Sequence, residues 1–403
     1  MNFYIKTYGC KLNQSDSEIM REILLKKHKE TSLKDADFVV INTCGVVEKT
    51  ERKIIKEAKE LKSKGKRIII SGCLPLISPE ECKKVADAII GPTNILSIDL
   101  AVEEDIINTK KTKLDKASIV SKKTGIVPIA EGCLGNCSYC ATKLARKELF
   151  SFASENIIKE IEQLVDSGIK EVQLTSQDLS VYGMDNGDCL SNLLEKIVNI
   201  KGDFKIKLGM MNPKYVNNRL LGVYKSDKIY KFIHLPIQSG DNELLKKMRR
   251  GYSSADFVSI VNKFRKLFKE SIIATDIIVG HPLETEESFN KTFKLIEEIK
   301  PEVIHIFKFS RRKGTEDFNL KDLPDRIKKE RSRKLSKLFQ EMNLEKNSKY
   351  IGKQFNVLVV EKRKDNYLAR TDSGRAVILN KGKIGEYSKI TIADCRWNYL
   401  IAN

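Results

Sequence analysis

The chain has 403 residues, 32% charged and 41% hydrophobic, which is enough for two or three globular domains and excludes a single small disulfide-stabilised scaffold. Its net charge of +19 favours a polyanionic partner, with nucleic acid as the leading candidate and a merely lysine-rich surface as the alternative. No apolar run approaches the roughly 20 residues that cross a bilayer, and the N-terminus lacks the zones of a signal peptide. We therefore expect a cytoplasmic protein with no membrane partner.

The first 110 residues alternate short apolar runs with helical patterns, which predicts βαβ units and a parallel sheet. The expected strands are Phe3–Tyr8, Phe38–Asn42 and Arg67–Ser71, and the expected helices are Ser15–Lys27 and Glu48–Ser63. Cys10, Cys44 and Cys73 each follow the C-terminal end of one of these strands. Ligands collect at that edge of an open parallel sheet, so this placement favours convergence of the three thiols over three separate packing cysteines.

A charged stretch at 108–123 lacks a sustained apolar period and is interpreted as a linker or exposed helix at a domain boundary. A second α/β alternation then runs from 124 to 345. The expected strands are Gly125–Ile129, Glu171–Thr175, Lys205–Gly209, Phe232–Leu235, Ile272–Val279 and Val303–Phe309, and the expected helices include Glu155–Ser167, Leu190–Val198, Ala255–Phe268 and Glu286–Lys300. Six strand–helix repeats indicate a partial (β/α)6 barrel, in which chemistry takes place at the C-terminal ends of the strands.

In the last quarter of the chain, a basic helical pattern and then short β-rich runs replace the α/β alternation. One long basic helix is predicted over Arg326–Lys349. Short β-rich runs follow at Gln354–Val360, Tyr367–Thr371, Ala376–Leu379 and Ile390–Ala393. They indicate a small closed β-barrel over 350–403, of the kind used for oligonucleotide binding. Residues 308–349 and 350–403 carry net charges of +7 and +5, which places much of the basic excess beside this barrel.

Nine cysteines in a cytoplasmic chain indicate metal or redox chemistry rather than disulfides. Cys133, Cys137 and Cys140 form a Cys-x3-Cys-x2-Cys loop directly after a predicted strand. Thiolates suit iron-sulfur clusters or zinc. Three of them leave one iron of a four-iron cluster open to the amine and carboxylate of S-adenosylmethionine. A structural zinc site needs a fourth ligand, and no further Cys or His lies nearby in the sequence. The spacing therefore favours a cluster.

Further motifs follow in a fixed order: Thr7–Glu18, Asn42–Cys44, Ser71–Cys73, the cysteine loop, Gln173–Asp178, His234–Asp241 and Asp276–Gly280. With them, nearly the whole chain resembles the radical-SAM methylthiotransferase family, and the tail is similar to that family's TRAM domain, a small RNA-binding β-barrel. The resemblance implies two 4Fe-4S clusters and S-adenosylmethionine as cofactors. The cluster on Cys133, Cys137 and Cys140 would cleave S-adenosylmethionine, and the cluster on Cys10, Cys44 and Cys73 would carry the sulfur that is transferred.

Within the family, the opening Tyr8–Glu18 with Met20, together with Gln173–Asp178 and Met210–Pro213, looks most like the archaeal and eukaryotic branch. That resemblance implies 2-methylthiolation of N6-threonylcarbamoyladenosine-37, beside the anticodon, in tRNAs that read codons beginning with A. The implied partners are the tRNA anticodon stem-loop and a reductant protein, and we expect a monomer. The alternatives are action on isopentenyladenosine in tRNA, action on a ribosomal protein, or a non-catalytic RNA-binding iron-sulfur protein.

Several other residues are candidates for the site. Arg146 is expected to contact a carboxylate or phosphate as a catalytic side chain. Tyr139 would pack on the adenine of S-adenosylmethionine or simply within its loop. Candidates for polar or backbone contacts to the cofactor are Gln177, Asp178, Gln238, Ser239 and Gly280, although such residues also cap loops. His281 is interpreted as a satisfied structural histidine. The chain departs from the family pattern at Lys147, His281, Leu283 and Lys313.

Overall fold

The computed structural model describes residues 1–104 and 125–402, and the stretch predicted as a linker at 108–123 lies outside them. The N-terminal domain is a parallel sheet of order β2-β1-β3-β4-β5. Its strands are β1 (Asn2–Thr7), β2 (Lys29–Glu30), β3 (Phe38–Thr43), β4 (Arg67–Gly72) and β5 (Ala88–Ile90). The predicted parallel sheet is confirmed, with β2 and β5 as additional edge strands. This is the doubly wound order in which ligands bind where the strand order reverses.

Both faces of this sheet are covered, which is why every residue of β3 is buried. Helix α1 (Lys11–Leu24) packs on the face that carries Phe38 and Val40, and α2 (Glu48–Lys62) packs on the face that carries Val39 and Ile41. Successive strand residues point to opposite faces, so one apolar run supplies two hydrophobic layers.

The middle of the chain forms the six-stranded partial barrel that the sequence predicts. Its parallel strands are β6 (Ile126–Pro128), β9 (Glu171–Thr175), β10 (Lys205–Leu208), β11 (Phe232–His234), β12 (Ile272–Val279) and β13 (Val303–Lys308). They form two sheets of order β10-β9-β6 and β11-β12-β13, joined by a parallel bridge between Met210 and His234. The outer helices are α6 (Ser154–Asp166), α7 (Leu190–Val198), α8 (Asn218–Val223), α9 (Asn242–Lys247), α10 (Ser254–Leu267) and α11 (Glu286–Ile299).

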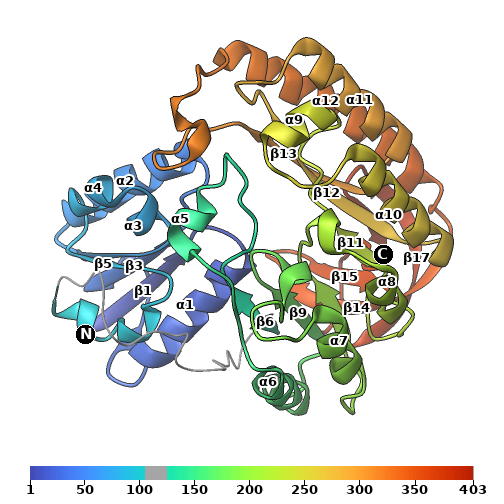
Figure 1. Ribbon diagram of the computed structural model, residues 1–403. Helices are drawn as coiled ribbons and strands as arrows, with labels where there is room; N and C mark the ends of the chain where they lie inside the picture. Colours follow the sequence, from blue (N-terminus) through green and yellow to red (C-terminus); the bar gives the residue numbers. More distant parts are fainter. Residues whose placement is uncertain (105–124, 403) are drawn as a thin grey trace.

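Short elements make the connections. They are α3 (Leu74–Ile77), α4 (Pro79–Lys83), α5 (Thr142–Arg146), the two-stranded pair β7 (Ala130–Glu131) and β8 (Phe150–Ser151), and 3-10 turns at Ile95–Ser97, Leu100–Val102, Leu179–Val181, Pro213–Tyr215 and Glu316–Asn319. Figure 1 shows α5 between the blue N-terminal domain and the barrel, beside α3.

A long helix, α12 (Asp325–Ser348), leads to a closed barrel of order β14-β15-β16-β18-β17. Its strands are β14 (Gln354–Lys362), β15 (Tyr367–Thr371), β16 (Ala376–Leu379), β17 (Tyr387–Arg396) and β18 (Tyr399–Ala402). The predicted closed barrel is confirmed, with β17 longer than expected and β18 as an additional strand. Asn347 at the end of α12 donates to the carbonyls of Arg396 at 2.7 Å and Trp397 at 3.2 Å, which fixes the small barrel to the helix. Among the described residues, no helix is long and apolar enough to span a membrane.

Candidate active site

The first part of the site is the loop between β7 and α5, which carries Cys133, Cys137 and Cys140. The Gly135 N–H donates to the Cys133 sulfur at 3.1 Å, and a Cβ at position 135 would lie 3.2 Å from that sulfur and 3.8 Å from the Cys137 sulfur. Only glycine leaves this hollow between the thiols open. Burial raises the pKa of Cys133 to about 11 and also raises the pKa of Cys140. Such thiols ionise when a metal centre binds them, so the hollow and its donors fit an iron-sulfur cluster.

Ser138 anchors this loop to the rest of the barrel. Its N–H donates to the Met248 carbonyl at 3.3 Å, and its hydroxyl donates to Asp317 at 2.7 Å. The same Asp317 oxygen pairs with His281 Nε2 at 2.9 Å, and His281 Nδ1 accepts from the Leu283 N–H at 3.2 Å. His281 is fully buried with both ring nitrogens satisfied, which confirms its structural interpretation.

Arg250 is a member of the site that the sequence analysis missed. Its guanidinium donates to the Cys137 sulfur at 3.1 Å, to the Pro236 carbonyl at 3.1 Å and to the Tyr252 hydroxyl at 2.8 Å. Arg250 is itself buried, so these contacts fix its guanidinium against one of the three cysteines of the loop. The available signal was the run Arg249–Tyr252, a pair of arginines followed by glycine and tyrosine in the loop between α9 and α10.

Asp178 and Tyr139 also lie around the cysteine loop. Asp178 accepts from the N–H groups of Ser180 and Asn212, both at 3.0 Å, so it caps a turn at the barrel mouth. Burial raises its pKa, and it is close enough to Cys133 to raise the pKa of that thiol. The Tyr139 ring packs on a small apolar cluster: Leu244, Met248, Ile278 and Phe309. Both residues therefore have structural contacts at the edge of the site.

Buried polar atoms without partners mark the barrel mouth. Gln238 has a φ of 72°, a strained conformation for a residue with a side chain. Its Oε1 has no hydrogen-bond partner within the described residues, and neither has Gln177 Oε1 or Ser176 Oγ. Buried polar atoms are normally satisfied, so these three indicate where a polar ligand binds.

Ser239 and Gly280, two further candidates from the sequence, lie in packing contacts instead. The Ser239 hydroxyl is 3.2 Å from the Thr292 hydroxyl and accepts from the Asp241 N–H at 3.1 Å. Gly280 lies against Lys328 of α12, because a Cβ at 280 would be 2.4 Å from its Cγ. Within residues 1–104 and 125–402, neither residue is linked to the cysteine loop by a hydrogen bond or ion pair.

The second part of the site is the set Cys10, Cys44 and Cys73, which follow β1, β3 and β4. Cys10 and Cys44 both lie close enough to Cys73 to raise the pKa of its thiol. Burial is the larger cause of the raised pKa of Cys73, and burial also raises the pKa of Cys44. Gly9 has a φ of 136°, and a Cβ there would lie 3.2 Å from Cys44 Cβ. The structure therefore brings the three cysteines together at one sheet edge, an arrangement that also fits a metal cluster.

Arg146 connects the two parts. It donates to both carboxylate oxygens of Glu131, at 2.9 and 2.8 Å, to Asp16 at 2.8 Å and to the Cys73 sulfur at 3.5 Å. Its side chain is 1% exposed. From the sequence, this guanidinium is expected to contact a carboxylate or phosphate; in the structure it contacts the carboxylates of two protein residues, Glu131 and Asp16.

The two cysteine sites are neighbours in space. Helix α5 begins two residues after Cys140, and Ala141 and Ala145 pack on Cys73 and Ile77. The five residues of α5 span roughly 8 Å at 1.5 Å per residue. One short helix therefore joins the barrel cysteines to the N-terminal cysteines (Figure 1).

The barrel lumen carries one further polar group. His234 Nε2 and His305 Nδ1 both lie 2.8 Å from the same oxygen of Asp276. Burial opposes ionisation of Asp276, but the two histidines hold its pKa well below the usual range. The three side chains satisfy one another inside the barrel.

Comparisons with known proteins place the fold and the cysteine sites in context. Residues 2–91 match the uncharacterized protein family UPF0004, residues 127–296 match the radical SAM superfamily, and residues 348–403 match the TRAM domain. The chain is 45% identical to a probable threonylcarbamoyladenosine tRNA methylthiotransferase of Archaeoglobus fulgidus, over 100% of this chain and 98% of that protein. It is 41% identical to a protein of the same description from Methanocaldococcus jannaschii, over 98% of this chain and 95% of that protein.

Among solved structures, the fold is similar to the radical S-adenosylmethionine methyltransferase TsrM from Kitasatospora setae with cobalamin and a [4Fe-4S] cluster bound. The TM-score is 0.57 at 13% identity, and the match covers 79% of this chain and 77% of that chain. At this identity the likeness concerns the fold alone.

Proposed function

The chain belongs to the radical-SAM methylthiotransferase family, and on this premise we propose that it converts N6-threonylcarbamoyladenosine-37 of tRNA to the 2-methylthio derivative. The relatives that share its full length bear that description. The radical SAM family implies a 4Fe-4S cluster and S-adenosylmethionine. A reductant protein would deliver the electron that the reaction consumes.

The observation that carries the proposal is the pair of cysteine triplets joined by α5. We assign the cluster that meets S-adenosylmethionine to Cys133, Cys137 and Cys140, and a second 4Fe-4S cluster to Cys10, Cys44 and Cys73. When bound, the first cluster and S-adenosylmethionine supply a carbon radical, which can remove hydrogen from an unactivated aromatic C–H bond. A radical site and a sulfur site must reach the same carbon, and their closeness across α5 meets that requirement.

Other side chains would position a cluster ligand, the cofactor and the two domains. Arg250 would support the thiolate of Cys137, and the unpaired oxygens of Gln177 and Gln238 would contact the cofactor at the barrel mouth. Arg146 would hold Cys73 by keeping the barrel and the N-terminal domain together. The role of Arg146 is then positioning rather than contact with substrate.

The RNA part of the proposal is supported by the TRAM domain and by the charge of the tail, net +5 over 350–403. Bases of an anticodon loop are already partly unstacked, so presenting one to a protein site costs less than extracting it from a duplex.

The test is incubation of the reconstituted chain with S-adenosylmethionine, a sulfide source and a reductant, using anticodon stem-loops that bear threonylcarbamoyladenosine, isopentenyladenosine or plain adenosine. Mass spectrometry of the digested nucleosides should show the methylthio group only on threonylcarbamoyladenosine. Efficient modification of the isopentenyl RNA would assign the other tRNA branch. A methylthio group found only on a ribosomal protein would overturn the tRNA proposal.

A further inference from the structure

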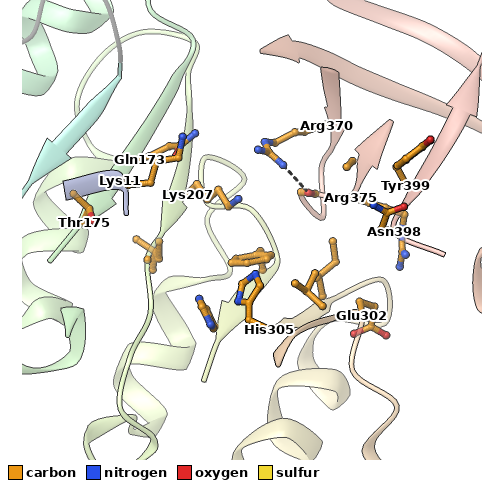
Figure 2. Close-up of a pocket in the computed structure, with 18 of the residues that line it drawn as sticks. Lys11, Gln173, Thr175, Lys207, Glu302, His305, Arg370, Arg375, Asn398 and Tyr399 are labelled. Carbon is orange, nitrogen blue, oxygen red and sulfur yellow. Dashed lines mark hydrogen bonds between the residues drawn. The ribbon is translucent and has the colours of Figure 1, made fainter. Parts of the chain in front are cut away.

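A cavity of about 280 Å³ lies inside the partial barrel, where the three domains meet. Figure 2 shows its polar lining: the N-terminal domain contributes Lys11, the barrel contributes Lys207 and His305, and the small barrel contributes Arg370 and Arg375. Pockets that take whole drug-sized ligands measure roughly 300–1,000 Å³. This cavity is smaller and suits one substituent of a larger ligand.

Positive charge dominates the lining. Four of its side chains are Lys or Arg, and the one carboxylate among the described lining residues is Glu302. That carboxylate is already engaged, because it accepts from Lys346 at 2.5 Å and from the Ile273 N–H at 2.9 Å. The cavity therefore presents more cationic groups than the protein itself neutralises.

Of the four cations in the cavity lining, Lys207 has the fewest polar partners within the described protein. Its ammonium lies 4.7 Å from the centre of the Phe232 ring and has no hydrogen-bond or ion-pair partner among the described residues. Burial is the largest cause that lowers the pKa of Lys207 to about 7; the nearby Arg370 and Lys11 also act to lower it, and Glu171 acts to raise it. Glu171 forms an ion pair with Arg370 at 2.8 Å and accepts a hydrogen bond from the Tyr230 hydroxyl at 3.0 Å. Its carboxylate therefore pairs with residues other than Lys207. An anion in the cavity would supply the partner that Lys207 lacks.

The position of the cavity points to the base being modified. Lys11 directly follows Cys10, one of the three N-terminal cysteines. A nucleoside whose carbon 2 faces the sulfur site would thus carry its N6 substituent close to this cavity. The threonylcarbamoyl substituent ends in a carboxylate, and this anion is small enough for a cavity of about 280 Å³. The RNA phosphates carry the same charge, but they belong to a backbone too large for this cavity.

We propose that this cavity binds the carboxylate of the threonylcarbamoyl group, with Lys207 as the specificity-determining contact and with Arg370 and Lys11 adding to the positive field. The inference rests on the proposed function and deepens it by naming the groups that distinguish this substrate from a neutral isopentenyl base. Arg146, whose donors are occupied, is not needed for that recognition.

The test compares Lys207→Met with Lys207→Arg and with the matched control Lys196→Met, a lysine half-exposed on α7 outside the barrel. Each reconstituted full-length protein is titrated with three fluorescent anticodon stem-loops. They bear threonylcarbamoyladenosine, its neutral methyl ester, or plain adenosine. Equilibrium anisotropy gives the affinities independently of turnover, and product formation is measured in parallel. Among the described residues Lys207 has no hydrogen-bond or ion-pair partner to lose, and a methionine can still pack on the Phe232 ring, so Lys207→Met should fold.

The unsubstituted chain should bind the acid RNA about 10–100-fold more tightly than the ester, the range of one charged hydrogen bond. Lys207→Met should abolish that preference by weakening the acid RNA alone. Lys207→Arg should retain most of it, and Lys196→Met all of it.

Three results would separate the possible failures. A preference that survives Lys207→Met while the acid RNA is still methylthiolated overturns the cavity assignment and leaves the function standing. Equal weakening of all three RNAs means that Lys207 contacts a phosphate, which also overturns it. If the unsubstituted chain cleaves S-adenosylmethionine but leaves the acid RNA unmodified, the proposed function fails, while the binding data still measure what the cavity recognises.

Discussion

Replacing Arg146 with Met is the sharpest test of how the two cysteine sites are held together. The change removes the guanidinium that joins Glu131 of the barrel to Asp16 of the N-terminal domain, and these side chains are only 2% and 1% exposed. Breaking a buried ion pair by deleting one partner costs about 3–5 kcal/mol, because the remaining buried charge loses the opposite charge that faced it. Each kcal/mol is worth about 2–4 °C in a domain of 150–250 residues, so the unfolding transition should fall by about 6–20 °C.

The assay is differential scanning calorimetry of the iron-loaded protein, with Arg219→Met as the matched control. Arg219 also pairs with a glutamate, Glu195, at 2.9 Å, but both side chains are about half exposed, so its loss should move the transition far less. Adding Asp16→Asn and Glu131→Gln to Arg146→Met should recover most of the loss, since the two buried charges that faced the guanidinium are then removed with it. Equal shifts for Arg146→Met and Arg219→Met would refute the reasoning.

Three further outcomes are expected. Burial raises the pKa of Glu160 from 4.5 to about 8, so the free energy of unfolding falls as the pH rises through that window. In urea unfolding at several pH values, Glu160→Gln should remove about 1.4 kcal/mol per pH unit from this pH dependence, and an unchanged dependence would contradict the prediction. Arg250→Met should lower the rate of S-adenosylmethionine cleavage about 10–100-fold at unchanged iron content, because Cys137 loses its donor; wild-type cleavage would show that this contact is dispensable. Lys362 and Lys364 are exposed, and neutralising both should weaken the salt dependence of anticodon stem-loop binding. The slope of log K against log salt concentration should become shallower by about 0.7 for each phosphate contact that is lost. An identical slope would show that the RNA binds elsewhere.

Much of the fold was predictable because it depends on local periodicity. The apolar runs that became β3, β9 and β12 are long, β-rich and bounded by clear turn signals, and the structure has them at Phe38–Thr43, Glu171–Thr175 and Ile272–Val279. The two-residue strand β2 (Lys29–Glu30) has no such signal, since it exists only through pairing with β1.

The candidate site was predictable where one residue type and its spacing carry the chemistry, as for the six cysteines. It was not predictable where a side chain is defined by a distant partner. Arg146 lies 130 residues from Asp16 in sequence, and Arg250 lies 113 residues from Cys137. Neither separation leaves a local pattern. The cavity around Lys207 likewise depends on three domains meeting, which no single stretch of sequence encodes.

The division of labour between the two cysteine sites is the central claim, and parallel measurement of 5′-deoxyadenosine and methylthio product in two triple variants tests it most directly. The unsubstituted chain should hold about eight iron atoms, four per cluster, and each triple variant about four. Replacing Cys133, Cys137 and Cys140 with Ala should abolish both products. Replacing Cys10, Cys44 and Cys73 should preserve 5′-deoxyadenosine formation and abolish the methylthio product. Equal loss of 5′-deoxyadenosine in both variants would contradict the account.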